Sequence, residues 1–195
     1  MMADYGVGNL HSIRKALERS GADVEAVTDM GRLAGAECIV FPGVGAFDSA
    51  MGRLLPHREA IRGRLLSGVP ALGVCIGAQI LFESSEEGSS EGMGFFGGRV
   101  VRLRAERVPH IGWNSVESED PLLEGISDRR FYFAHSYRCS PSGGGAAGWT
   151  EYEGESFPSL FRKANVYGTQ FHPEKSAGSG LRLIEGFIRF AEGRL

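Results

Sequence analysis

Apolar positions in the first half of the chain alternate between helix-like spacing and short buried runs. Leu10, Ile13 and Leu17 lie on one face of a helix whose pattern stops at Gly21. A short, wholly apolar run that ends at a Pro-Gly pair is typical of a buried parallel strand. The elements predicted for this half are a helix over 9–19, a strand over 24–27, a strand over 38–41 and a helix over 46–66 that is interrupted before Pro56.

The second half has shorter strand-like runs, divided by glycine, proline and serine. The predicted elements are strands over 100–103, 130–133, 160–162 and 166–171, a hairpin loop at 163–165, a surface loop at 143–145 and an amphipathic helix over 181–191. Only three residues precede Asp4, which is too few for a full first strand. Together the halves predict an α/β fold with an open, mostly parallel sheet flanked by helices. An additional antiparallel β segment is expected in the second half, and residues 1–195 are expected to form one domain.

The segment from Gly73 to Gly77 predicts a sharp turn that exposes a cysteine. The apolar run 69–72 precedes it, and a helix-compatible segment over 76–82 follows. This strand–turn–helix pattern is the thiol counterpart of the nucleophile elbow. Glycine on both sides of Cys75 permits a turn that is too tight for bulky neighbours. A glycine-flanked cysteine alone is more often a buried core residue, so a nucleophile needs a base elsewhere in the chain.

His172-Pro173-Glu174 supplies such a base and a group to orient it. Proline biases the preceding histidine toward extended backbone, where side chains two residues apart share a face. Glu174 would then fix the imidazole tautomer so that the other ring nitrogen faces the sulfur. His135 is a second candidate for the base, but it has no carboxylate two residues away.

A third loop is expected beside these two. In open parallel sheets the ligand site lies beyond the carboxyl ends of the strands, where the residues after 41, 74 and 171 would meet. Gly43 and Gly45 let the chain pass close to the nucleophile. Acyl transfer needs backbone N–H donors for the oxyanion, and those of Val44 and Ile76 are the candidates.

Composition narrows the class of protein. Hydrophobic residues make up 42% and charged residues 23%, as in globular chains, and a net charge of −3 without a basic block favours neither nucleic acid nor an anionic membrane as a partner. No apolar run is long enough to span a bilayer, and the start has no secretory pattern. Three scattered cysteines indicate neither a disulfide framework nor a zinc site. A cytoplasmic protein without a metal is expected.

Six segments resemble the class I glutamine amidotransferases, and within them the glutaminase subunits of imidazole glycerol phosphate synthase in histidine biosynthesis. Residues 73–79 and 170–176 match the class, and residues 4–10, 42–47, 110–114 and 133–137 match the subunit. The resemblance covers nearly the whole chain and implies the flavodoxin-like fold of class I glutaminases. Ile76 and Ala78 stand where the family usually has leucine and methionine, which bears only on pocket packing.

The resemblance implies hydrolysis of L-glutamine through a cysteinyl thioester, without a cofactor. It implies a catalytic triad of Cys75, His172 and Glu174, with the backbone donors at Val44 and Ile76. The residues implied in glutamine binding are Gly43, Gly45, Gln79, Glu87, Ser136 and Tyr137. Ammonia would pass to a cyclase subunit with a (β/α)₈ barrel in a heterodimer, and the residues implied at that interface are Asn9, Trp113, Tyr132 and Lys175.

Three alternatives stay open at this point. The chain could be the glutaminase of another synthase, of the anthranilate or guanylate type, although residues 110–114 weigh against it. A catalytically silent binding module of the same fold is disfavoured by the complete triad. A thiol peptidase is the third, and nothing in the sequence indicates an extended peptide groove.

Overall fold

The computed structural model describes residues 1–6, 8 and 10–194. Within them a seven-stranded sheet has the order β10-β11-β12-β4-β3-β1-β2. The strands from β12 to β2 are parallel, whereas β10 and β11 are antiparallel and extend one edge. These strands are β1 (Met2–Ala3), β2 (Ala26–Val27), β3 (Ile39–Phe41), β4 (Ala71–Val74), β10 (Ala146–Tyr152), β11 (Glu155–Lys163) and β12 (Val166–Thr169). The predicted mostly parallel sheet with an added antiparallel segment is confirmed.

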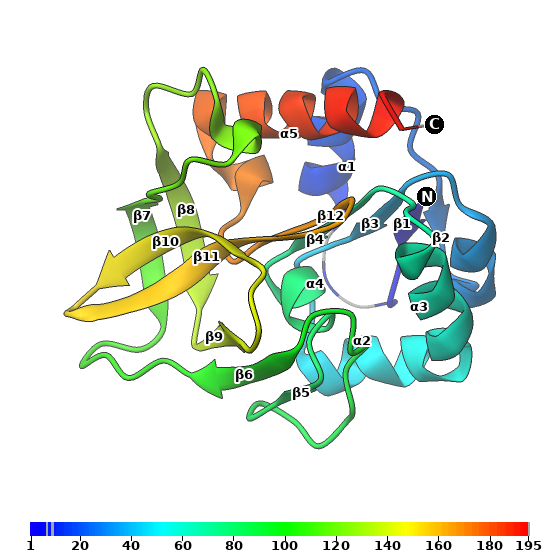
Figure 1. The fold of residues 1–195 in the computed structure, drawn as a ribbon, viewed down its shortest axis with the longest axis horizontal. Helices are drawn as coiled ribbons and strands as arrows, with labels where there is room; N and C mark the ends of the chain where they lie inside the picture. The colour runs from blue at the N-terminus through cyan, green and yellow to red at the C-terminus, as the bar shows by residue number, and fades with distance from the viewer. Residues whose placement is uncertain (7, 9, 195) are drawn as a thin grey trace.

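Helices cover both faces of the sheet (Figure 1). On one face α1 and α5 pack over apolar side chains such as Leu72 and Tyr167, and on the other face α2 and α3 pack over side chains such as Phe41 and Ala71. The helices are α1 (His11–Arg19), α2 (Phe47–Leu54), α3 (Arg58–Leu66), α4 (Ile76–Gln79) and α5 (Ala177–Glu192), and the 3-10 turns are η1 (Met30–Gly35), η2 (Leu55–His57), η3 (Pro121–Leu123) and η4 (Pro173–Lys175). The interruption predicted before Pro56 is confirmed as η2.

Two smaller sheets stand beside the antiparallel edge of the large sheet in the part of the chain that the structure describes (Figure 1). One contains β5 (Ser84–Ser85), β6 (Gly98–Arg102) and β9 (Tyr137–Pro141), and the other is a ribbon of β7 (His110–Ser115) and β8 (Arg130–His135). Along β7 the side chains alternate: His110 is buried, whereas Ile111 and Trp113 are 61% and 52% exposed. The ribbon therefore presents one apolar face outward and packs the other against the protein.

Several predicted boundaries were wrong. The last helix begins at Ala177 rather than at residue 181, and the helix after Cys75 ends at Gln79 rather than at residue 82. The predicted first helix begins at His11, and the first residue of the prediction, Asn9, lies outside the described residues. Although β1 has two residues, it is not an edge strand, because it pairs with both β2 and β3. No helix among the described residues is long and apolar enough to cross a membrane.

Candidate active site

Cys75 occupies a strained turn between β4 and α4. Its φ of 49° lies in the left-handed region, which a residue with a side chain rarely adopts. The turn leaves no space beside it, because a Cβ on Gly77 would lie 1.9 Å from the carbonyl oxygen of Phe41, and one on Gly73 would lie 2.5 Å from that of Gly77. The predicted elbow is confirmed, and backbone crowding is the reason for both glycines.

His172 and Glu174 meet as the spacing predicts. The imidazole Nδ1 lies 2.8 Å from Glu174 Oε1, and both side chains are buried. The local path differs from the expected extended segment: His172 is extended, but Pro173 starts the 3-10 turn η4, which folds the carboxylate back onto the ring. The backbone of β8 holds the histidine from the other side, because His172 N–H donates to the Tyr132 carbonyl at 2.8 Å.

The protonation of His172 is set by two opposing effects. Burial lowers its pKa, but the sulfur of Cys75, through charge and a hydrogen bond, and the carboxylate of Glu174 outweigh burial and raise that pKa to about 10. The other oxygen of Glu174, Oε2, is buried and finds no hydrogen-bond donor in the described part of the chain. The hydrogen bond from the His172 imidazolium therefore stabilises the buried carboxylate charge.

The predicted substrate residues surround a cavity of about 300 Å³ that contains both Cys75 and His172. Its other lining residues are Gly43, Gly45, Ile76, Gln79, Glu87, Pro109, Ile111, Ala134, His135, Ser136 and Tyr137. The three loops that follow β3, β4 and β12 thus converge as predicted. Ile76 lines the cavity, and Gly43 and Gly45 line it on either side of Val44. The oxyanion roles of the Val44 and Ile76 N–H groups stay a prediction.

Gln79 lines this cavity, and the fully buried Gln170 lies behind it. Gln79 Nε2 donates to the Tyr137 carbonyl at 2.9 Å and to Gln170 Oε1 at 3.2 Å, and Gln170 Nε2 lies 3.8 Å from Cys75 Sγ. Glu87 Oε2 accepts from the N–H of Phe47 at 3.1 Å, which caps α2 and fixes the carboxylate. Sequence reasoning missed Gln170. Its adjacency to the Phe171-His172 pair was the available signal.

His135 lines the same cavity but is not free to act as a base. Its Nδ1 lies 2.9 Å from the Tyr137 carbonyl, and its Nε2 lies 3.1 Å from Nδ1 of His110. Burial lowers the pKa of His135 to about 3, with further lowering from His110 and His172. Ranking His172 above His135 as the candidate base agrees with this geometry.

Three residues predicted at a partner interface lie near His172. The rings of Trp113 and Tyr132 are 6.3 Å apart on the β7–β8 ribbon, and Lys175 is exposed in η4. The fourth, Asn9, lies outside the described residues. Their role toward a partner stays a prediction.

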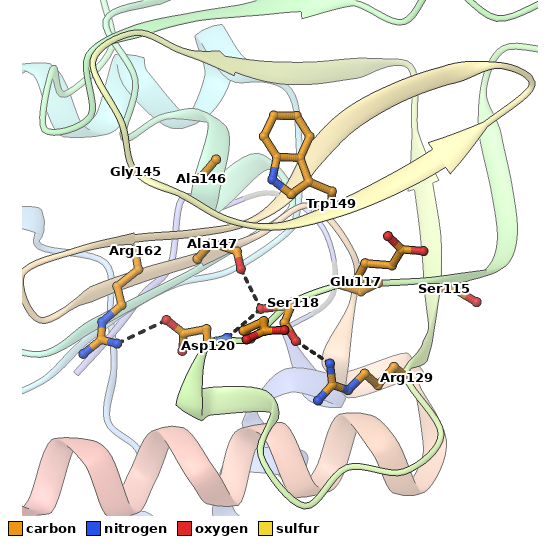
Figure 2. Close-up of a pocket in the computed structure, with 12 residues that line it drawn as sticks. Ser115, Glu117, Ser118, Asp120, Arg129, Gly145, Ala146, Ala147, Trp149 and Arg162 are labelled. Atoms are coloured by element: carbon orange, nitrogen blue, oxygen red, sulfur yellow. Dashed lines mark hydrogen bonds and ion pairs between the residues drawn. The ribbon is translucent and has the colours of Figure 1, made fainter.

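A larger cavity of about 940 Å³ lies away from these residues, between β10, β11 and the segment 115–120 (Figure 2). Both of its arginines are used internally: Arg162 pairs with Asp120 at 3.1 Å, and Arg129 donates to the Ser118 carbonyl. Asp120 also accepts from Leu122 N–H at 2.9 Å. These interactions hold the edge of the sheet together, so we assign no ligand to this cavity.

Comparisons with known proteins identify the family of this chain. The family described as glutamine amidotransferase class-I matches residues 1–189, and the chain belongs to it. Within that family, the imidazole glycerol phosphate synthase subunit HisH of Thermococcus kodakarensis is 47% identical over 196 residues, covering 96% of this chain and 98% of the relative. The protein of the same description from Methanocaldococcus jannaschii is 46% identical and covers 95% of this chain and 96% of the relative.

A solved structure described as a glutamine amidotransferase has the same fold. It superimposes with a TM-score of 0.76 and covers 97% of each chain, at 21% sequence identity. Fold and family membership therefore agree over nearly the whole chain.

Proposed function

We propose that this chain is the glutaminase subunit of an imidazole glycerol phosphate synthase in histidine biosynthesis, and that it hydrolyses L-glutamine at Cys75. The observation that carries the proposal is the convergence of a cysteine elbow and a buried histidine–glutamate pair in one cavity. Family membership supplies the reaction class, and the HisH relatives supply the synthase. A catalytically silent module would have no need of a strained cysteine turn or of a buried ion pair.

The first chemical step follows from the proton that His172 holds. With the imidazolium beside it, the sulfur of Cys75 attacks the side-chain carbonyl carbon of glutamine as a thiolate. The electron pair moves onto oxygen, where backbone N–H groups such as those of Val44 and Ile76 stabilise the oxyanion. When the tetrahedral intermediate collapses, His172 protonates the departing nitrogen. The products are ammonia and a glutamyl thioester.

The second step uses the same imidazole as a base. His172, now neutral at Nε2, takes a proton from water, and the hydroxide attacks the thioester carbon. Collapse returns the electron pair to sulfur and releases glutamate. Glu174 holds Nδ1–H throughout, so the ring keeps one orientation in both steps. The sum is glutamine plus water to glutamate plus ammonia, which the chain's own residues accomplish.

The ammonia would then serve a partner. The HisH relatives are each described as a subunit of a synthase, so a second subunit is expected. We propose that this is a cyclase with a (β/α)₈ barrel, in a heterodimer, docked on the face that carries Trp113, Tyr132 and Lys175. The large exposed fractions of Ile111 and Trp113 next to the cavity support this face. We also propose that residues 1–195 act as one domain in the cytoplasm.

Covalent labelling tests the catalytic assignment. The electrophilic glutamine analogue 6-diazo-5-oxo-L-norleucine should label Cys75, as peptide mapping would show. The chain contains its own controls: burial raises the pKa of the Cys38 thiol to about 11 and raises that of Cys139 well above the usual value. Labelling of Cys38 or Cys139 with Cys75 unmodified would refute the assignment. Co-purification with a barrel-fold cyclase, and stimulation of glutamate release by it, would test the partner.

A further inference from the structure

Two buried imidazoles that the proposed mechanism does not use face each other across the β7–β8 ribbon. His110 and His135 are directly opposite in the strand register, and their Nδ1 and Nε2 atoms are 3.1 Å apart. They are 2% and 6% exposed, respectively. The ring of His110 also stacks on Tyr152, with ring centres 3.9 Å apart, and on Phe133 at 4.7 Å. The pair is thus held rigidly at the wall of the substrate cavity.

The hydrogen bonds of this pair can run in one direction only. A carbonyl accepts but never donates, so His135 must carry its proton on Nδ1, which lies 2.9 Å from the Tyr137 oxygen. Burial lowers the pKa of His135 to about 3 and that of His110 to about 4, so both rings are neutral near pH 7. His135 Nε2 is then an acceptor, and His110 Nδ1–H is its donor.

The far end of the chain of hydrogen bonds is fixed in the same way. Asn114 Nδ2 donates to the carbonyl of Glu151 at 2.8 Å and lies 3.4 Å from His110 Nε2. That nitrogen is the acceptor, because the His110 proton is on Nδ1. Both rings are therefore neutral Nδ1–H tautomers, and protonation of either would set two donors against each other.

At its other end, this series of hydrogen bonds reaches the residues that face the substrate. The Tyr137 carbonyl accepts from His135 and also from Gln79 Nε2, at 2.9 Å in each case. The second N–H of Gln79 is used by Gln170. One backbone carbonyl therefore fixes both the segment 136–137 and the orientation of the Gln79 amide.

We propose that His110 and His135 are positioning residues for glutamine binding, acting through the Tyr137 carbonyl to hold the backbone of residues 136–137 and the amide of Gln79 in their binding geometry. The inference rests on the proposed glutaminase function. It assigns the pair to recognition of the amino-acid substrate and not to proton transfer, because neither ring has a nitrogen available to Cys75. Loss of the pair should weaken glutamine binding and spare the reactivity of the thiol.

The test compares His110→Phe with His110→Asn in the complex with the cyclase. Phenylalanine keeps the ring stack on Tyr152 but removes the donor to His135, so KM for glutamine should rise about tenfold, the effect of roughly one hydrogen bond. The value of kcat and the rate of Cys75 alkylation by iodoacetamide should each change less than about threefold. Asparagine places an N–H at the position of Nδ1 and should restore most of the KM. His57→Phe, in η2 away from the cavity, is the matched control.

Two further measurements, of glutamine affinity and of the ring protonation states, test the same proposal. In a Cys75→Ala background, His110→Phe should weaken equilibrium binding of glutamine about tenfold, and unchanged affinity would overturn the proposal. If His110→Phe does not fold, ¹⁵N NMR of the unmodified complex decides, because a proton on Nε2 of either ring would overturn it. Failure of the wild-type complex to release glutamate while Cys75→Ala binds glutamine would contradict the proposed hydrolysis alone.

Discussion

Two histidine sites face one small cavity and hold opposite protonation states. His172 has its pKa raised to about 10 despite burial, because a sulfur and a carboxylate flank it. His135 and His110 have theirs lowered to about 3 and about 4, because burial is opposed only weakly. The difference lies in the partners: the Cys75 sulfur and the Glu174 carboxylate flank His172, whereas a carbonyl and a second neutral ring flank His135. Burial alone therefore does not decide which histidine can move protons.

The largest expected effect comes from substitution of His172, the histidine whose pKa is raised. His172→Ala removes both acid and base, so kcat for glutamate release should fall by roughly 10⁴-fold or more. His135→Asn keeps an N–H toward the Tyr137 carbonyl and should change kcat far less. Steady-state kinetics of both variants with the cyclase would measure this. A dead His135→Asn enzyme beside an active His172→Ala enzyme would show that the roles are reversed.

The next effect concerns the anion that orients His172. Glu174→Gln keeps the shape but removes the charge, so the imidazolium loses stabilisation and kcat should fall by roughly 10²- to 10⁴-fold. The pKa of His172 should fall in the same variant. Glu59→Gln, which removes an exposed carboxylate from α3 away from the cavity, is the matched control for the loss of one negative charge. Equal activity of Glu174→Gln and wild type would exclude an orienting role for the carboxylate.

The neutral pair should be visible in the pH dependence of stability. Because the folded pKa values of His110 and His135 lie below the unfolded value of about 6.5, the unfolded chain binds more protons as pH falls. Their contribution is therefore present above about pH 6.5 and is lost as pH falls toward about 4 and about 3. Denaturant unfolding between pH 7 and 4 should show a loss of a few kcal/mol that is smaller in the His110→Asn variant. An unchanged slope in that variant would contradict the neutral pair.

The smallest expected effect is on the partner face. Trp113 is half exposed and contacts Tyr132, and Trp113→Ala should weaken cyclase binding by roughly ten- to a hundredfold without changing the fold. Trp149→Ala removes a comparably exposed tryptophan beside the large cavity and is the control. Titration calorimetry would measure both. Equal affinities of the two variants would remove Trp113 from the interface.

The side of the cavity that contains Cys75 and His172 could be predicted from the sequence because its signals are local. The glycines around Cys75 and the proline after His172 each constrain the backbone within a few residues. The apolar runs that form β3 and β4 are continuous, so their burial in the sheet was also predictable.

The other side of the cavity, around His135, is formed by strands that pair across long stretches of sequence. β7, β9 and β10 are interrupted by polar residues, by glycine in β7 and β10 and by proline in β9, and gave no clear strand pattern. The meeting of His110 with His135 requires the register of two strands whose residues are 25 positions apart. Gln170 gains its contacts only when β12 lies beside β4. Such contacts are set by tertiary packing, and no short motif encodes them.

One measurement tests the central claim, that His172 alone among His110, His135 and His172 is doubly protonated at pH 7. ¹⁵N NMR of the imidazole rings in the wild-type protein and in Cys75→Ala would follow each histidine from pH 5 to pH 10. We predict that His172 is doubly protonated at pH 7, that its pKa falls when the sulfur is removed, and that His110 and His135 stay neutral Nδ1–H rings throughout. A neutral His172 at pH 7, with His135 titrating near 6.5, would contradict the account.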